Sequence, residues 1–121
     1  MHVAALNNSV GAVEIILDYD RKLLHARDKK KWTAFLLAAM NGHVKVLEVL
    51  KNRGQDLNET TVKNGWSGLH IAAENGRVGV VKFLLANGAN KNMRTTGGAL
   101  KGSTAKHIAE RKGKMQVVEL F

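Results

Sequence analysis

Apolar and polar positions follow a pattern that recurs four times along the chain. The recurring segments begin at residues 2, 36, 70 and 107, so successive segments are 34, 34 and 37 residues apart. Each contains small apolar residues, about two polar residues, a Gly or Asn, and then an apolar run that ends in Leu or Phe. A period of this length indicates a repeat architecture, in which each unit packs against the next. The segments read HVAALNNSVGAVEIIL, LLAAMNGHVKVLEVLK, HIAAENGRVGVVKFLL and HIAERKGKMQVVELF.

Each unit is predicted to form two short helices. In the third unit, residues 69–73 supply small and apolar side chains that allow close packing of the first helix. Residues 80–84 place apolar side chains at a spacing typical of a broad apolar stripe, which predicts the second helix. One helix pair cannot bury both of its faces, so stability must come from stacking on the next pair. The sequence therefore predicts an all-α repeat fold, an α-solenoid.

Glycine is predicted to end most of these helices. The chain has no proline, so its turns must be made with Gly and Asn. A left-handed residue commonly follows the last turn of a helix, and glycine adopts that conformation most easily. Asn8 holds the equivalent position in the first unit, where Asn is the usual substitute. The remaining helix ends are assigned to Gly42, Gly76 and Gly113 for first helices and to Gly54 and Gly88 for second helices.

The first helices open with a related motif. It reads SGLHIA at residues 67–72, and more loosely TAKHIA at 104–109 and TAFLLA at 33–38. A second element, GANKN, occupies residues 88–92, and a less similar version, GQDLN, occupies residues 54–58. These segments resemble the ankyrin repeat family, whose units open with Thr-Pro-Leu-His-x-Ala and later contain Gly-Ala-Asn-x-Asn. The resemblance covers essentially the whole chain, but the motif proline is missing from every unit, so the repeats are diverged.

The resemblance implies one domain of stacked helix–turn–helix units, with β-hairpin-like loops projecting between them. In the family, the motif histidine bonds to the backbone and links the turn to the helix, which assigns structural roles to His70 and His107. The last apolar residues are not replaced by the polar face that terminal repeats normally carry, so we expect a piece of a longer array. The expected units of the single domain 1–121 are residues 1–26 (partial), 27–60, 61–94 and 95–121 (partial).

The residue types typical of active sites form no catalytic or metal-binding pattern in this chain. There is no cysteine, which excludes disulfides, thiolate metal sites and cysteine nucleophiles. Ser67 lies at a helix start, where serine is an ordinary N-cap, and GWSG is not the nucleophile elbow. The five histidines are 18 to 37 residues apart, without the spacing of zinc ligands. The loop GGALKGST lacks a Lys directly before its Ser or Thr, which a P-loop requires. We expect no catalytic residue, no metal and no cofactor.

Trp32 and Trp66 are the leading candidates for partner binding. They are 34 residues apart and occupy the same position of their repeat units. Because stacked helix layers lie about 8–10 Å apart, the two indoles should lie side by side. Each ring either packs over the neighbouring loop or is exposed as an anchor for a partner, as tryptophan often is in interfaces. The resemblance implies a concave binding face of loops and first-helix ends. The first-helix candidates are Met40, Asn41, Glu74, Asn75, Arg111 and Lys112.

The chain carries a net charge of +9, which favours acidic partners. The three loops contribute Lys30, Lys63 and Arg94 as further candidates, and the acids nearest to Lys30 and Lys63 in the sequence are Asp28 and Glu59. A cluster of charged residues is usually a solvent-exposed surface without a binding role, and that interpretation stays open. The main hypothesis is a non-enzymatic module that binds a partner protein or peptide, preferably an acidic one, on its concave face. The alternative is nucleic-acid or nucleotide binding through basic loops and stacked indoles, and a third possibility is a purely structural spacer.

Nothing in the sequence points to a membrane protein. No apolar run approaches the roughly 20 residues that a membrane-spanning helix needs. The N-terminus lacks the charged and apolar blocks of a signal peptide. We therefore expect an intracellular monomer that does not insert into membranes.

Overall fold

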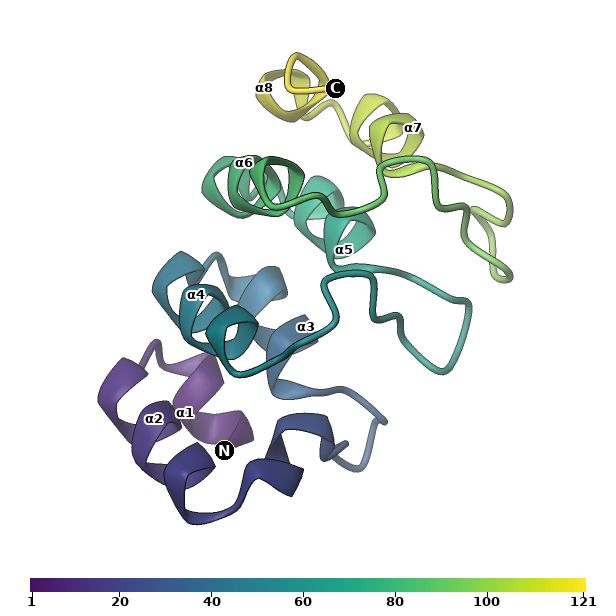
Figure 1. Ribbon diagram of the computed structural model, residues 1–121. Coiled ribbons are helices and arrows are strands. Elements are labelled where there is room, and N and C mark those ends of the chain that lie inside the picture. The colour runs from purple at the N-terminus through teal and green to yellow at the C-terminus, as the bar shows by residue number, and fades with distance from the viewer.

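A computed structural model describes residues 1–121, with the side chain of Leu6 left out. Over these residues the chain forms helices in pairs, which confirms the predicted all-α repeat fold. Figure 1 shows the pairs stacked in chain order, with the two termini at opposite ends of the stack. The pairs are α1 (His2–Leu6) with α2 (Val10–Tyr19), α3 (Ala34–Asn41) with α4 (Val44–Asn52), α5 (Gly68–Glu74) with α6 (Val78–Ala86), and α7 (Ala105–Arg111) with α8 (Met115–Val118).

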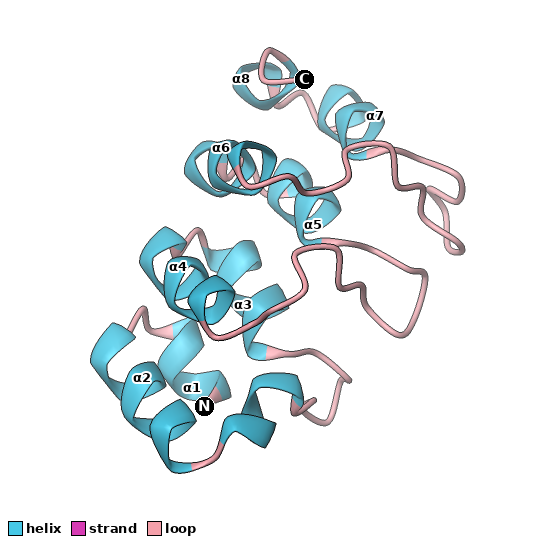
Figure 2. Cartoon of the chain, viewed as in Figure 1, coloured by secondary structure: helices cyan, strands magenta, loops and turns pink.

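The loops between the pairs project from one side of the stack, as Figure 2 shows. They are hairpin-like without forming strands, since the described residues contain only an isolated antiparallel bridge between Thr60 and Ser67. A backbone hydrogen bond closes the base of each loop. These bonds run from the N–H of Asp28 to the carbonyl of Trp32 (2.8 Å), from Thr61 to Trp66 (2.8 Å) and from Thr95 to Ser103 (2.9 Å).

The first helices after α1 begin at a side-chain cap. The hydroxyl oxygens of Thr33, Ser67 and Thr104 each accept the backbone N–H three residues further on. Such a cap satisfies one of the donors that a helix start leaves without a partner in the helix. The motif therefore places each loop directly before a fixed helix start.

Six of the helices, all except α2 and α8, are followed within two residues by a residue in the left-handed conformation. The five glycines assigned to helix ends have φ between 66° and 95°, and Asn8 has φ 56°. At Gly42 space matters as well as φ, because a Cβ atom there would lie 3.1 Å from the side chain of Arg77 in the next unit. The Arg77 Nε–H donates to the carbonyl of Met40 at 2.9 Å, so this side chain ties the third helix pair to the second.

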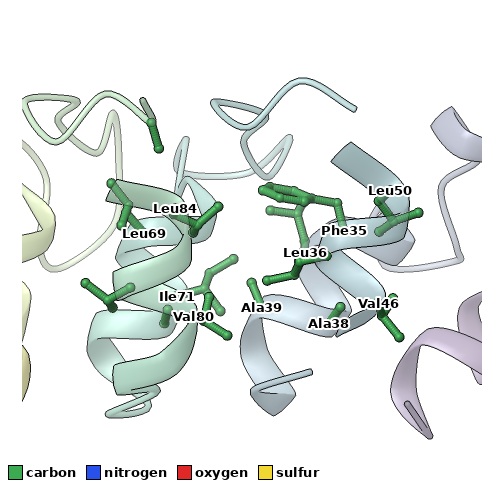
Figure 3. Close-up of a cluster of buried hydrophobic side chains, with 14 of the residues drawn as sticks. Phe35, Leu36, Ala38, Ala39, Val46, Leu50, Leu69, Ile71, Val80 and Leu84 are labelled. Carbon is green, nitrogen blue, oxygen red and sulfur yellow. The ribbon is translucent and has the colours of Figure 1, made fainter. Parts of the chain in front are cut away.

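The core lies between successive pairs. Figure 3 shows Phe35, Leu69 and Leu84 between the second and third pairs, and all of them are buried. A Cβ atom at Gly68 would lie 3.0 Å from two ring atoms of Phe35. Phe35 thus occupies the space that the motif proline would need, which explains why glycine stands at this position.

One element was not predicted from the sequence. A turn of 3-10 helix, η1 (Arg21–His25), follows α2, and the Asp20 side chain caps it by accepting the N–H of Lys22 at 2.9 Å. It buries Leu24 in the core. None of the described helices is long and apolar enough to cross a bilayer. The division into units at residues 26, 60 and 94 stays a prediction.

Candidate partner-binding groove

Trp32 and Trp66 stand at the ends of the first and second loops, directly before the caps Thr33 and Ser67. Both side chains are half-buried, and both pack against the hydrophobic core. The Trp66 ring also lies 6.1 Å from the His70 ring, between centroids, at an interplanar angle of 53°. Each indole therefore packs on the scaffold and keeps part of its surface exposed.

The backbone at each indole is held by a side chain at the start of the loop. Asp28 Oδ1 accepts the N–H of Trp32 at 2.9 Å, and Thr61 Oγ1 accepts the N–H of Trp66 at 3.0 Å. In the third loop, Thr95 Oγ1 accepts the N–H of Ser103 at 3.2 Å. The sequence did not reveal that these side chains accept a backbone N–H at the end of each loop. The loops differ in length, and the acceptor is an aspartate in the first loop and a threonine in the other two.

His70 connects the third unit to the loop that follows it. Its Nδ1 accepts the backbone N–H of Ser67 at 3.0 Å, and its Nε2 lies 3.0 Å from the carbonyl oxygens of both Met93 and Ser103. A backbone N–H only donates and a carbonyl only accepts, so the ring carries its proton on Nε2 and is neutral. Burial lowers the pKa of His70 below its usual 6.5, and the two carbonyl hydrogen bonds oppose this shift.

His107 does not form the expected link within the described residues. Its ring is exposed, and it makes no hydrogen bond to any residue that the structure describes. The carbonyls that His70 contacts belong to the loop that follows its own helix pair. His2 is the second histidine with the linking role, since its Nε2 lies 3.0 Å from the carbonyl of Ala26 in the first loop.

The second unit replaces the histidine link with a carboxylate. Leu36 stands at the motif position and cannot form a hydrogen bond through its side chain. The cap Thr33 instead donates its hydroxyl proton to Glu59 Oε1 at 2.5 Å, across 26 residues. Glu59, expected to be one of the few acids on a basic edge, is therefore used to join a helix start to the next loop.

Three hollows lie in a row between the loops and the first helices, and we call this row the groove. The first hollow, at α3, has a volume of about 530 Å³, and Trp32, Leu37 and Met40 line it. The middle hollow, about 370 Å³, lies between Trp32 and Trp66. The third hollow, at α7, has about 460 Å³. Trp32 borders the first and middle hollows, and Trp66 borders the middle and third, so neighbouring hollows adjoin at an indole.

The family comparison fits this arrangement of paired helices, loops and linking histidines. The family described as "Ankyrin repeats (3 copies)" matches residues 1–95, which is most of the chain. The chain belongs to the ankyrin repeat family. No curated protein matches it. Ankyrin repeats imply a protein–protein interaction module, and such modules are typically non-catalytic. Within the described residues, no group of three or more His, Cys, Asp or Glu side chains could hold a metal ion.

The ankyrin groove brings together most of the candidates from the sequence. Asn41 and Arg94 do not line it. The Asn41 amide donates to the carbonyl of Leu37 in its own helix at 2.9 Å, and the Arg94 guanidinium donates to the carbonyl of Gly102 in its own loop at 3.1 Å. The candidates that line the groove are Trp32, Trp66, Met40, Glu74, Asn75, Arg111, Lys112, Lys30 and Lys63.

The charge of the ankyrin groove is predominantly basic. Of its two acids, Asp28 is engaged by backbone, since one carboxylate oxygen accepts the N–H groups of Lys30 and Trp32, each at 2.9 Å. Glu74 forms the other acidic contact, a long ion pair of 3.8 Å with Lys112. Both partners of that pair are substantially exposed, at 39% and 46% of the side chain, so water screens it strongly.

Proposed function

We propose that this ankyrin chain binds an acidic segment of a partner protein in the groove, without catalysing a reaction. The observation that carries the proposal is the shared position of the two indoles. Trp32 and Trp66 both line the middle hollow, so a partner segment placed there can contact both indoles. Burial of tryptophan in the centre of an interface commonly supplies a large part of the binding free energy.

The charges around the indoles support an acidic partner. Lys30 and Lys63 line the middle hollow from the loops, and Arg111 and Lys112 line the third hollow from the C-terminal end of α7. Cations at the rim of an interface accelerate association with an acidic segment and select against basic ones. The groove thus combines an apolar anchor point with charge that is complementary to carboxylates.

The loops that form one wall of the groove are connected to one another. The N–H of Thr96 donates to the carbonyl of Asn64 at 2.8 Å, which joins the third loop to the second. The N–H of Asn90 donates to Asn58 Oδ1 at 2.7 Å and adds a second link between them. A wall that is already ordered loses less conformational entropy on binding, which favours affinity.

We also propose that residues 95–121 form a fourth ankyrin unit, although the family match ends at residue 95. Helix α7 packs against α5, and α8 packs against α6 and α7, as in the preceding pairs. The fourth unit is needed for the proposed function, because it supplies Arg111 and Lys112 to the third hollow.

Intrinsic fluorescence tests the proposal directly, because the two tryptophans of the chain both line the groove. Peptides selected from a random phage-displayed library are titrated into the protein, and the change in indole emission gives the affinity. We expect the selected peptides to be rich in Asp and Glu next to an apolar residue. Selected peptides that bind without changing the emission would contradict the proposal.

Two charge-reversal variants distinguish an effect of contacts in the groove on binding from an effect of net charge. The variant Lys30→Glu/Lys63→Glu should weaken binding about tenfold or more, which corresponds to about 1.4 kcal/mol. The matched control, Lys45→Glu/Lys82→Glu, changes net charge equally at exposed positions on α4 and α6 that do not line the groove. Equal weakening by both variants would show a long-range charge effect and no binding in the groove.

An oligonucleotide titration tests nucleic-acid binding, which is the alternative function. A labelled single-stranded oligonucleotide is titrated at two salt concentrations. Binding through phosphates makes log affinity fall linearly with log salt concentration, with a slope set by the number of phosphates contacted. If the oligonucleotide binds more tightly than any selected peptide and shows this slope, nucleic-acid binding replaces the proposed function.

A further inference from the structure

The first helices α3, α5 and α7 form the floor of the groove, and the chemistry of this floor changes from one unit to the next. The last-turn residues Met40, Glu74 and Arg111 occupy the same position in α3, α5 and α7. All three line the groove, Met40 in the first and middle hollows, Glu74 in the middle and third, and Arg111 in the third. The floor is therefore apolar at α3, acidic at α5 and basic at α7.

The α3 end is suited to an apolar side chain. Trp32, Leu37 and Met40 are the apolar residues that line the first hollow. The cations of this hollow, Lys29 and Lys30, come from the loop wall and not from the helix floor. An apolar side chain can thus lie on the floor there while the lysines remain at the rim.

The α7 end is suited to carboxylates. Arg111 and Lys112 come from the helix floor and are exposed. Over the described residues Arg111 has no ion-pair partner, and the 3.8 Å contact leaves Lys112 weakly held by Glu74. The loop wall opposite them is uncharged, since it consists of Gly97, Gly98, Ala99 and Leu100.

We propose that the groove binds its partner segment in a single direction, with an apolar side chain in the hollow at α3 and carboxylates at Arg111 and Lys112, at the C-terminal end of α7. This inference rests on the proposed function and adds the order of chemical groups along the bound segment. The reverse placement puts carboxylates on the apolar floor of Trp32, Leu37 and Met40, where desolvation opposes them. It also leaves the two cations of α7 facing apolar groups.

Single-tryptophan variants locate each end of a bound peptide. Trp32→Phe leaves Trp66 as the only indole, and Trp66→Phe leaves Trp32, while an aromatic ring stays in each slot. The probe is a short synthetic peptide with a Phe-Leu pair at one end and a run of Glu at the other. It is made in two versions, with a dabcyl quencher at the acidic end or at the apolar end.

The acidic-end quencher should cause a larger loss of emission from Trp66 than from Trp32, and the apolar-end quencher should reverse that order. Equal losses for both versions, or the opposite order, would overturn the single direction while leaving the proposed function intact. A peptide that causes no emission change in the unsubstituted protein, with or without quencher, contradicts the proposed function and this inference together.

A second variant tests the basic end independently. Arg111→Ala/Lys112→Ala should weaken the Glu peptide several-fold and have little effect on a version in which Gln replaces every Glu. The control Lys106→Ala/Lys82→Ala removes two exposed cations that do not line the groove. Equal weakening of both peptides by the α7 variant would overturn the assignment of carboxylates to Arg111 and Lys112.

Discussion

The hydroxyl of Thr61 fixes the backbone of Trp66. It accepts the Trp66 N–H at 3.0 Å and donates to the carbonyl of Lys63 at 2.5 Å, so one side chain holds both sides of the second loop. Thr61 is buried, and Trp66 borders two of the three hollows. The scaffold and the candidate binding site are therefore connected at this hydrogen bond.

Replacing Thr61 with Val should loosen the loop and lower stability. The Trp66 N–H and the Lys63 carbonyl would each lose a partner, at a cost of about 1–2 kcal/mol in the free energy of unfolding. The emission of Trp66, measured in the Trp32→Phe background, should shift as well. Urea unfolding and emission spectra test this, with Thr60→Val as the control, because Thr60 adjoins Thr61 and its side chain forms none of these bonds. Identical results for the two variants would contradict the role of Thr61.

Stability should fall in mild acid because of His70. Burial lowers the pKa of His70 in the folded chain below 6.5, so the unfolded chain takes up a proton at a higher pH. The stability that comes from a neutral His70 in the folded chain is fully present above about pH 6.5. It declines as pH falls through the lowered pKa of the folded chain, and it stays lost at lower pH. Urea unfolding across this range measures the slope.

The substitution His70→Leu should flatten that pH dependence, and it copies the residue that the second unit has at Leu36. The control is His107→Leu, which makes the same change at an exposed ring without hydrogen bonds to the described residues. The slope is the diagnostic quantity, because His70→Leu also lowers stability at every pH by removing the links to Met93 and Ser103. An unchanged slope in His70→Leu would refute the assignment.

Gly68→Ala should destabilise the protein, although alanine favours helices. Its Cβ would lie 3.0 Å from the fully buried ring of Phe35, and such overpacking costs about 1–3 kcal/mol. Combining it with Phe35→Leu should recover part of the loss, which a double-mutant cycle measures as coupling. Gly11→Ala is the matched control, since nothing lies within 4 Å of its Cβ position on α2, and it should stabilise by up to about 1 kcal/mol. Additive effects of Gly68→Ala and Phe35→Leu would exclude a steric clash as the cause.

Glu74→Gln should strengthen binding of an acidic peptide about threefold, because it removes a carboxylate from the groove and frees Lys112. Thermal stability should hardly change, since the ion pair is exposed. Glu48→Gln makes the same change of charge at an exposed position of α4 outside the groove. Fluorescence titration of both variants separates the local effect from the change in net charge, and equal affinities would show that Glu74 does not act on the ligand.

The sequence alone determined the features that depend on local conformation and on period. Caps such as Ser67 and helix ends such as Gly76 follow from residues within one turn, and both lie where the pattern placed them. The 34-residue spacing of Trp32 and Trp66 was sufficient to place both at the same groove, because stacked units repeat one geometry.

The tertiary structure decided the features that need a partner far away in the chain. His70 and His107 share one motif, yet of the two rings only that of His70 lies within hydrogen-bond distance of backbone carbonyls, those of Met93 and Ser103, in the described residues. Glycine at position 68 is explained by Phe35, one unit earlier. The three hollows exist because loops and helices from successive units form opposite walls. A local pattern specifies backbone conformation, whereas burial, hydrogen-bond partners and cavity shape depend on which units stack against each other.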